Sequence, residues 1–446
     1  MKDKKITGNV RDAAFTILWA VENKQAYSNL LLTKTMDSHA VAPKDRGLLT
    51  EITYGTLQHQ MTLDYYLEPF IKGKVEPWVR VLLRMSLYQI VYLDRIPNHA
   101  AVNEAVEIAK KRGHAGIGSM VNGVLRSVLR NGVRNFEDIK DEVTRLSIET
   151  SHPVWLIKRW IGQFGYDKTR EMALENNKIP PQTVRVNTVK TTVKEAIKML
   201  ADEGMIAEAS GVVPECLMVT GGQPARSNTF AQGFITIQDE SSMLPAYALQ
   251  VEPGHRVLDL CAAPGGKTTH IAEKMGNKGE LQALDLHDHK VKLIKQAATR
   301  LGHTIISAQA GDGRKIREQF GDAAFDRILV DAPCSGLGVI KRKPDIKYSK
   351  QEADFERLQS IQLDLLDEAA AMLKVGGIVV YSTCTVDAEE NEGTVRRFLA
   401  EHPEMESVPV QLPFTKEQNE QHFVQVFPQD FGGDGSFVSA FCKNGQ

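Results

Sequence analysis

The sequence predicts an α/β protein whose carboxyl-terminal part is a doubly wound parallel sheet. Three observations support this prediction. From about residue 250, short apolar runs alternate with helical patterns, which is typical of parallel strands joined by crossover helices. Residues 1–134 have helical patterns, and residues 135–240 mix helices with strands. We therefore expect three domains: an all-helical domain at 1–134, a small α/β module with linker helices at 135–240, and the sheet domain at 241–446.

The first region is predicted to be a helical bundle. Residues 117–130 place apolar side chains on one face of an amphipathic helix. Arg126 and Arg130 lie off that face, where they can meet solvent or phosphate. Two more helices are predicted at 98–113 and 81–93. The apolar face of the 117–130 helix comprises Ile117, Met120, Val121, Val124, Leu125, Val128 and Leu129.

Charge is distributed unevenly along the chain. Residues 1–134 contain 19 Lys and Arg against 12 Asp and Glu, a net charge of +7, whereas the whole chain carries −2. Such asymmetry suggests that the helical region meets a polyanion. Chance placement of solvated charges explains the same numbers equally well.

The later elements follow in order along the chain. In the middle region a helix is predicted at 153–165, a strand at 183–189, a helix at 192–204 that begins at a threonine cap, and a strand at 233–242. The sheet domain is predicted to have strands within 256–263, 281–286, 304–312, 325–333 and 377–384, helices within 267–276, 289–302, 349–374 and 388–402, and two final strands within 422–429 and 436–443.

Composition excludes several classes of protein. With 446 residues, 42% hydrophobic and 25% charged, the chain is typical of a soluble globular protein with several domains. The first residues lack the apolar run of a signal peptide, and no stretch approaches the roughly 18 apolar residues of a membrane span. Five cysteines without paired spacing indicate reduced thiols in the cytoplasm, and argue against a zinc site.

A glycine-containing turn lies at the predicted end of the first sheet strand, in “CAAPGGKTTH”, residues 261–270. Ligands of open α/β sheets bind beyond the carboxyl ends of the strands. A phosphate-binding P-loop would need glycine five residues before Gly266, where Cys261 stands. The dinucleotide fingerprint GxGxxG is absent too. What remains is a short turn, with Gly265 and Gly266, that lets the backbone approach a ligand closely.

Acids at the next two strand ends indicate which ligand this is. Asp285 follows the second strand, where a carboxylate can hold ribose hydroxyls, and Asp312 ends the third, where it can accept from an exocyclic amine. Either acid alone is better explained as a helix N-cap. Together with the glycine turn, they favour an adenine–ribose ligand without a clear phosphate site, which points to S-adenosylmethionine.

Two cysteines follow the fourth and fifth strands: Cys334 in “DAPCSG” and Cys384 in “YSTC”. A single cysteine there is more often a small buried hydrophobe, and a disulfide is a further alternative. Two thiols at neighbouring strand ends, beside Asp331, favour a catalytic role for the cysteines. Cytosine C5 becomes nucleophilic when a thiolate adds to C6, and a carboxyl group such as Asp331 can polarise the ring at N3 and N4. One thiol would attack and the other assist release; this reasoning does not fix which.

Three motifs then suggest a family. “LDLCAAPGGKTTH”, “DAPCSGLGVIKRKPDI” and “YSTCTVDAEEN” resemble the Fmu/Sun family of RNA cytosine-5 methyltransferases. The helical front, with “RIPNHAAVNEAVEIAK” and “VNGVLRSVLR”, is similar to the NusB-type RNA-binding domain of the family member that modifies bacterial small-subunit rRNA. “SHPVWLIKRW” and “VRVNTV” match the middle section of that enzyme, so the similarity covers nearly the whole chain.

The resemblance implies a Rossmann-like class I methyltransferase domain after a NusB-like domain, and 16S rRNA as the partner. It implies that Cys384 is the nucleophile, that Cys334 assists release, and that Asp331 faces both the cofactor and the base. Lys341, Arg342 and Lys343 either grip RNA phosphates or form an ordinary solvated cluster. The implied S-adenosylmethionine contacts are Cys261, Ala262, Ala263, Pro264, Gly265, Gly266, Lys267, Asp285, Asp312 and Asp331.

Other functions stay open at this point. They are a non-catalytic NusB-like RNA-binding or antitermination protein, a methyltransferase of a tRNA cytosine, and a methyltransferase of an amino nitrogen. The intact glycine turn, acids and cysteines count against the first, and a nitrogen acceptor has no need of a thiol. We expect a cytoplasmic monomer that uses no metal and no membrane, acting on a cytosine that is unstacked or in a loop.

Overall fold

The computed structural model divides the chain into two compact units. The first comprises Met1–Lys178 together with Ile340–Lys350, and the second comprises Ile179–Val339 and Gln351–Gln446. The structure describes all residues except 3, 25–27, 414–421 and 446. The division into domains at 1–134, 135–240 and 241–446 stays a prediction.

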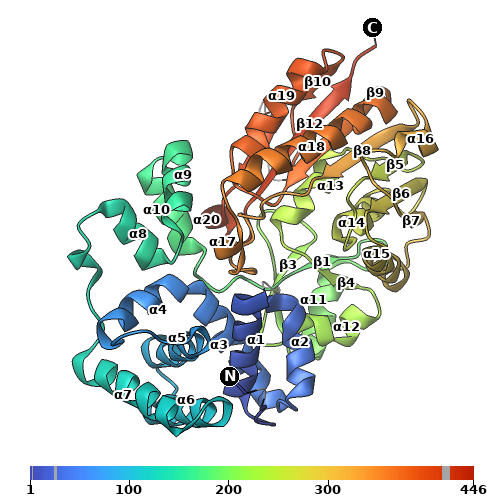
Figure 1. The fold of residues 1–446 in the computed structure, drawn as a ribbon. Helices are drawn as coiled ribbons and strands as arrows, with labels where there is room; N and C mark the ends of the chain where they lie inside the picture. Colours follow the sequence, from blue (N-terminus) through green and yellow to red (C-terminus); the bar gives the residue numbers. More distant parts are fainter. Residues whose placement is uncertain (3, 25–27, 414–421, 446) are drawn as a thin grey trace. The chain divides into compact units, whose positions relative to one another are not determined.

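The first unit is helical, as predicted; residues 1–178 are blue to teal in Figure 1, and α17 is orange. Its core is formed by apolar side chains of the first seven helices, with Phe15, Leu82 and Leu125 fully buried. The helices are α1 (Val10–Lys24), α2 (Ser28–Ser38), α3 (Arg46–Gln58), α4 (Gln60–Leu67), α5 (Pro77–Tyr92), α6 (Asn98–Arg112), α7 (Ala115–Asn131), α8 (Glu142–Thr150), α9 (Val154–Phe164), α10 (Tyr166–Glu175) and α17 (Ile346–Ser349).

Helix α7 follows the predicted amphipathic pattern with one exception. Val121, Val124, Leu125 and Val128 are buried, but Leu129 is 38% exposed. Successive helical residues are about 100° apart, so Leu129 turns toward solvent when Val128 faces the core. The assignment of Leu129 to the buried face was therefore wrong.

The segment Ile340–Lys350 is anchored in the first unit by a buried lysine. The Lys347 ammonium donates to the backbone oxygen of Gln58 at 2.9 Å and to Asn177 Oδ1 at 2.7 Å. Its side chain is fully buried. Helix α17 thus belongs to the helical unit, although its sequence neighbours on both sides belong to the second unit.

The same segment corrects the interpretation of the basic cluster after the “CSG” turn. Lys341 is buried and its ammonium pairs with the Glu175 carboxylate at 2.6 Å. Lys341 is therefore neither a solvated charge nor available to an RNA phosphate. Of the three basic residues, Lys343 is exposed and Arg342 is half-buried.

The second unit begins with a small antiparallel sheet in the order β2-β3-β1-β4. Helix α11 packs on this sheet, and Thr192 caps it as predicted, in a capping box with Glu195. The elements are β1 (Thr183–Val186), α11 (Val193–Asp202), β2 (Ile206–Ala209), β3 (Cys216–Thr220), α12 (Asn228–Ala231) and β4 (Ile235–Ile237).

The main sheet has the order β10-β12-β9-β8-β5-β6-β7, and β11 also pairs with β12. Strands β7, β6, β5, β8 and β9 are parallel, whereas β12 runs antiparallel to β9, β10 and β11. The predicted doubly wound sheet is confirmed, and so are the two final strands. The strands are β5 (Arg256–Asp259), β6 (Glu280–Asp285), β7 (Ile306–Ala310), β8 (Phe325–Asp331), β9 (Leu373–Thr383), β10 (Met405–Val408), β11 (Phe423–Val426) and β12 (Ser436–Lys443).

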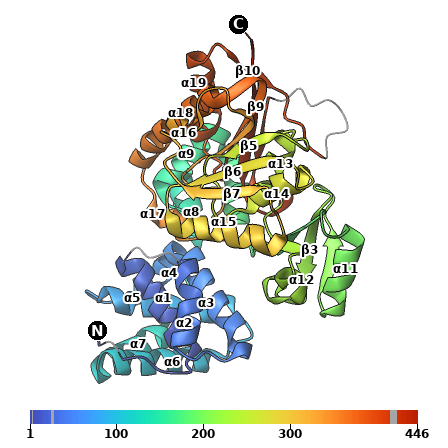
Figure 2. The same cartoon turned by 90° about the vertical axis from the view of Figure 1, so that its right-hand side faces the viewer.

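Helices cover both faces of this sheet (Figure 2). One face packs against α18 and α19 through side chains such as Leu366 and Phe398. The other packs against α13, α14 and α15 through side chains such as Ile271 and Ile294. The helices are α13 (Leu244–Ala248), α14 (Gly266–Lys274), α15 (Asp288–Leu301), α16 (Arg317–Phe320), α18 (Ala353–Met372), α19 (Thr394–Glu401) and α20 (Pro428–Phe431).

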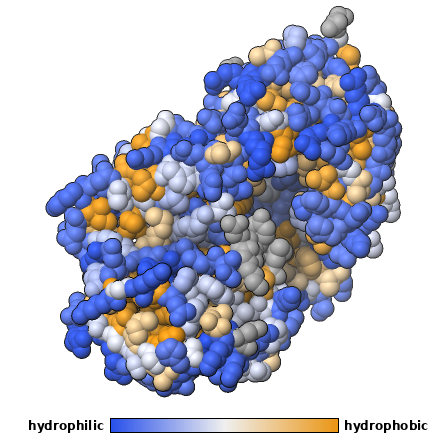
Figure 3. Space-filling view, in the orientation of Figure 1, coloured by the Kyte–Doolittle hydropathy of each residue, from blue (hydrophilic) through white to orange (hydrophobic). Residues whose placement is uncertain are grey.

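The surface seen in Figure 3 is mainly hydrophilic, with apolar side chains in separate small groups. Apolar groups of this size are normal on soluble proteins. Among the described residues, no helix is both long and apolar enough to cross a membrane.

Candidate active site

The predicted site residues gather at one edge of the main sheet. Parallel strands β5, β6, β7, β8 and β9 all end at this edge, and strand order reverses at β5, which pairs with β6 on one side and β8 on the other. A reversal of this kind opens a crevice where α/β sheets bind ligands. The loops that follow the five strands carry the glycine turn, three acids and both cysteines.

The glycine turn connects β5 to α14. Gly265 precedes the first helical residue and has φ +105°, a conformation that favours glycine. A Cβ at this position would come within 3.2 Å of the Ile294 Cα. The turn therefore needs glycine for its own geometry, and it leaves the backbone bare at the carboxyl end of β5.

Asp285 and Asp312 lie where the sequence placed them, and neither is a helix N-cap. Asp285 ends β6 and accepts from the His287 backbone N–H at 3.1 Å, while His287 is the N-cap of α15. Asp312 follows β7, and α16 starts only at Arg317. The alternative explanation, in which each acid is the N-cap of the following helix, is thus excluded. The Asp312 carboxylate accepts two hydrogen bonds from the Arg314 guanidinium, at 2.8 and 2.9 Å, which lower its pKa.

Asp331, the last residue of β8, is held from two sides. The Lys267 ammonium pairs with Asp331 Oδ2 at 2.7 Å, and the Ser382 hydroxyl donates to Oδ1 at 2.8 Å. Burial alone would lower the pKa of Lys267, but the Asp331 carboxylate outweighs burial and raises it. The pair joins the glycine turn to the strand that precedes Cys334, and no local pattern in the sequence predicted it.

The two cysteines meet at the ends of neighbouring strands. Their sulfur atoms are 3.3 Å apart, and both side chains are half-buried. The contact with the Cys384 sulfur, together with burial, raises the pKa of Cys334 well above its ordinary value. The raised pKa favours the protonated thiol of Cys334, and either sulfur can donate in the contact between the two thiols. Sequence reasoning placed both thiols at one crevice, and the structure brings them into contact.

Three buried charged residues around the site escaped the sequence analysis. Asp259 lies under the glycine turn, where it accepts from the Thr268 hydroxyl at 2.7 Å, and burial raises its pKa to about 7. Glu390 lies behind the cysteine loops, and burial raises its pKa to about 7 as well. Asp259 could have been noticed in the sequence as an acid inside an apolar strand. Glu390 could not, because it lies in an acidic run, and such runs are usually solvated.

The third is Arg185 on β1, which is fully buried. Its guanidinium donates to the Gly266 backbone oxygen at 2.8 Å and to Thr269 Oγ1 at 2.9 Å. Two further N–H groups donate to the Glu273 carboxylate, both at 2.9 Å. The small sheet thus supports the first turn of α14, directly after the glycine turn.

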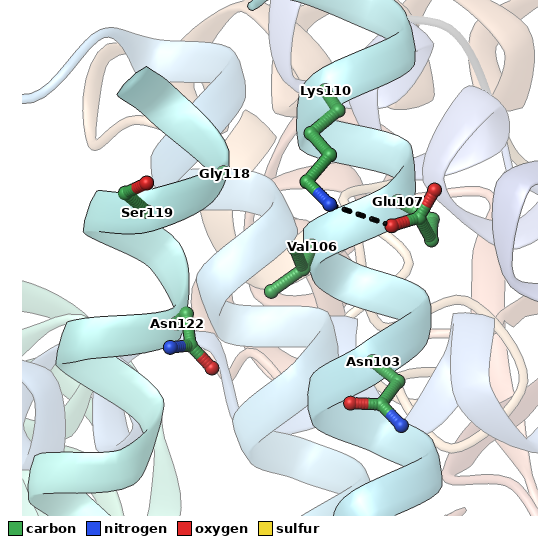
Figure 4. A pocket seen from close by; sticks show the side chains of 7 residues that line it. All are labelled: Asn103, Val106, Glu107, Lys110, Gly118, Ser119 and Asn122. Carbon is green, nitrogen blue, oxygen red and sulfur yellow. Dashed lines mark hydrogen bonds and ion pairs between the residues drawn. The ribbon is translucent and has the colours of Figure 1, made fainter. Parts of the chain in front are cut away.

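The helical unit has its own polar hollow, between α6 and α7 (Figure 4). It has a volume of about 340 Å³, and Lys110 at its edge pairs with Glu107 at 2.9 Å. Arg126 and Arg130, farther along α7, are exposed as predicted. The hollow is lined by Asn103, Val106, Glu107, Lys110, Gly118, Ser119 and Asn122. Within the described ranges, no group of His, Cys, Asp and Glu side chains is arranged to hold a metal ion.

The sheet order, the glycine turn after β5 and the acid after β6 define a Rossmann-like class I methyltransferase fold. The chain is 50% identical over 447 residues to the “Probable ribosomal RNA small subunit methyltransferase B” of Bacillus subtilis, covering 98% of this chain and 99% of that protein. It belongs to the RsmB/F family of 16S rRNA methyltransferases, whose model matches residues 246–442, and is by family an S-adenosylmethionine-dependent enzyme. The recognised resemblance is thereby confirmed.

Two further family models match the rest of the chain. The NusB model matches residues 8–130, and a ferredoxin-like domain model of RsmF/B-like methyltransferases matches residues 152–226. The crystal structure of PH0851 has a TM-score of 0.83 at 29% identity, covering 99% of this chain and 100% of that one. A methyltransferase homologue from Pyrococcus horikoshii has a TM-score of 0.59 at 27% identity, covering 68% of this chain and 100% of that one. The predicted fold class is confirmed.

Proposed function

We propose that this protein transfers a methyl group from S-adenosylmethionine to C5 of a cytosine in 16S rRNA, through a covalent bond between Cys384 and C6 of the base. The observation that carries the proposal is the contact of two thiols, 3.3 Å apart, next to the Asp331–Lys267 pair. An amino-nitrogen acceptor would need none of these thiols. We expect the enzyme to act in the cytoplasm, where its cysteines stay reduced.

The residues at the end of β5 fit S-adenosylmethionine. Gly265 and Gly266 carry no side chain where the chain turns at the end of β5, so the backbone can come close to a ligand, and Asp285 supplies a carboxylate suited to ribose hydroxyls. Asp312 can turn from Arg314 to an exocyclic amine, because both side chains are partly exposed. When bound, this cofactor supplies an electrophilic methyl group.

The protein's own residues would then activate the cytosine ring and later release it. The Cys384 thiolate would form a bond to C6, and the electrons of the C5–C6 double bond would move to C5. C5 would attack the methyl group, whose bond to sulfur would break with release of S-adenosylhomocysteine. Asp331, held by Lys267 and Ser382, polarises the ring at N3 and N4. A proton acceptor would then remove the proton from C5. The C5–C6 double bond would form again as the bond between C6 and Cys384 breaks. Cys334 would assist this last step.

The helical unit would supply affinity for the RNA backbone. Its net charge over residues 1–134 is +7, and Arg126 and Arg130 are exposed on α7. Phosphate contacts release counterions, so binding should weaken as salt rises. Replacing both arginines by glutamine should lower the slope of log affinity against log salt by about 1 per lost contact. An unchanged slope would remove these arginines from the interface.

Serine variants of the two cysteines test the covalent mechanism. With rRNA from cells that lack the protein, Cys334→Ser should accumulate a protein–RNA adduct that survives denaturation, because release is blocked. Cys384→Ser should form no adduct and no product. The opposite pattern would exchange the two roles, and normal turnover by Cys384→Ser would favour an amino-nitrogen acceptor.

Bisulfite sequencing of rRNA from cells with and without the gene tests the reaction itself. One cytosine in 16S rRNA should be protected only when the protein is present. Protection confined to a tRNA would redirect the proposal to that substrate. Failure to bind S-adenosylmethionine, together with unaltered rRNA, would favour a non-catalytic RNA-binding protein.

A further inference from the structure

A π-helical turn, Glu389–Gly393, lies directly behind the two cysteine loops and continues into α19. Sequence reasoning predicted an ordinary helix from residue 388. π turns are rare and recur at functional sites. Two consecutive side chains of this turn, Glu390 and Asn391, are polar and fully buried. Buried polar groups of this kind need partners, and each finds them in a different cysteine loop.

Glu390 holds the loop that carries Cys334. Its carboxylate accepts hydrogen bonds from the Ser335 backbone N–H, at 2.8 Å, and from the Ser335 hydroxyl. The Gln362 amide donates both to Glu390 Oε1 at 3.1 Å and to the Pro333 backbone oxygen at 3.0 Å. The residues immediately before and after Cys334 are thus fixed through one carboxylate and its amide neighbour.

Asn391 holds the residues on both sides of Cys384. Its Oδ1 accepts from the Thr383 hydroxyl at 2.6 Å, and its Nδ2 donates to the Thr385 backbone oxygen at 3.0 Å. The same Nδ2 donates to Gln425 Oε1 at 2.8 Å. One amide therefore bonds to the residues immediately before and after Cys384.

The two loops are also linked directly to each other. Ser335 Oγ and Thr385 Oγ1 are 2.8 Å apart with both side chains buried, and the Gly338 backbone N–H donates to the Cys384 backbone oxygen at 3.0 Å. Glu390 and Asn391 add to these links from behind the loops, where the two sulfur atoms are 3.3 Å apart. Because Glu390 and Asn391 are adjacent in one turn, both loops are held from a common base.

We propose that Glu390 and Asn391 are positioning residues with separate tasks: Glu390 places Cys334 for release, and Asn391 places Cys384 for attack. The assignment deepens the proposed function and rests on it. Neither residue contacts the base in this account. Each acts through the backbone and hydroxyl groups that flank one thiol.

The separation of tasks predicts opposite kinetic defects. Glu390→Ala should lengthen the lifetime of the covalent protein–RNA adduct by about tenfold or more, as expected from loss of a charge-assisted hydrogen bond. Asn391→Ala should slow adduct formation by a similar factor and leave the lifetime unchanged. Formation is measured in the Cys334→Ser background, where adduct accumulates, and lifetime in the otherwise unaltered enzyme. Rapid quenching followed by denaturing gels reports both rates.

Glu392→Ala is the matched control, because Glu392 lies on the same turn with its side chain exposed, and it should change neither rate. S-adenosylmethionine affinity and the circular-dichroism spectrum show whether each variant is folded. If an alanine variant does not fold, Glu390→Gln and Asn391→Asp give the measurement, with smaller shifts expected in the same directions.

Equal losses in both rates for both alanine variants would overturn the proposal, as would no loss in either. The serine variants of Cys334 and Cys384, measured alongside, separate this failure from a failure of the proposed function. If Cys384→Ser still forms the adduct, or Cys334→Ser accumulates none, the proposed roles of the cysteines are wrong. The separate tasks proposed for Glu390 and Asn391 are then wrong as well.

Discussion

Replacing Arg185 by methionine should destabilise the second unit by about 3–5 kcal/mol, the cost of removing one partner of a buried ion pair. Arg185 is fully buried and donates two hydrogen bonds of 2.9 Å to Glu273, whose side chain is 1% exposed. Methionine retains much of the apolar stem but neutralises no charge. The variant leaves the Glu273 carboxylate buried without a guanidinium partner, with the His303 imidazole 3.2 Å away.

The loss should depend on pH. Burial alone would raise the pKa of Glu273, but Arg185 holds it below its ordinary value of 4.5. In the natural protein the stabilising contribution of Glu273 is therefore present at neutral pH and lost only as pH falls through that lowered pKa. Without Arg185 the folded-state pKa rises above the unfolded one. The Arg185→Met variant should then gain stability as pH falls from 8 toward 5. The difference in unfolding free energy between the variant and the natural protein therefore becomes smaller.

Urea unfolding followed by two probes measures this effect. All four tryptophans, Trp19, Trp78, Trp155 and Trp160, belong to the first unit, so their fluorescence reports that unit alone. Far-ultraviolet circular dichroism reports both units. We expect a lower midpoint in the dichroism signal and an unchanged fluorescence midpoint.

Two control variants sharpen the measurement. Arg185→Met combined with Glu273→Leu should recover stability to within about 1 kcal/mol of the natural protein, because no charge is left unpaired. Arg357→Met, which breaks an exposed pair with Asp354, should cost less than about 1 kcal/mol. A loss below about 1 kcal/mol for Arg185→Met, or a double variant worse than the single one, would refute the reasoning.

Three further predictions concern the site. Gly338→Ala would place a Cβ against the Gly435 backbone oxygen and 2.8 Å from the Cys384 backbone oxygen. We therefore expect methyl transfer to fall by about 100-fold or more while S-adenosylmethionine binding, measured by calorimetry, persists. Normal turnover would show that this loop can move. Asp331→Asn removes the charge that pairs with Lys267 and should lower kcat by about 10²–10⁴-fold in a tritiated-methyl assay; a loss below tenfold would contradict its role in polarising the base. Because the pKa of Asp259 is raised to about 7, its neutral form stabilises the fold at low pH and this contribution is lost as pH rises through 7. Asp259→Asn should reduce the decrease in unfolding free energy between pH 5 and 8, measured by urea titrations. An unaltered pH dependence would show that a group other than Asp259 causes this decrease.

Local patterns in the sequence were enough for the sheet and for the position of the site. Alternating strands and helices put Asp285, Asp331 and Cys384 at strand ends, and parallel strands bring their ends to one edge. The glycine turn was found because Gly265 and Gly266 are adjacent at such an end. None of these inferences needed knowledge of which strands are neighbours.

Features that depend on pairing across the fold could not be predicted. The Lys267–Asp331 pair joins residues 64 positions apart, and the buried Lys341 pairs with Glu175, 166 positions away. In the sequence, Lys341 belongs to a basic run and Glu390 to an acidic run, and such runs are usually solvated. Burial of one member of a charged run leaves no local mark, because the partner that neutralises it is distant in sequence.

The excursion of Ile340–Lys350 into the helical unit means that neither unit is encoded by one continuous stretch of the gene. A fragment ending at Lys178 would lack Lys347, and the oxygens of Gln58 and Asn177 would lose the ammonium that they share. Swapping helical domains between relatives should therefore succeed only when the eleven-residue segment Ile340–Lys350 is transferred together with its helices.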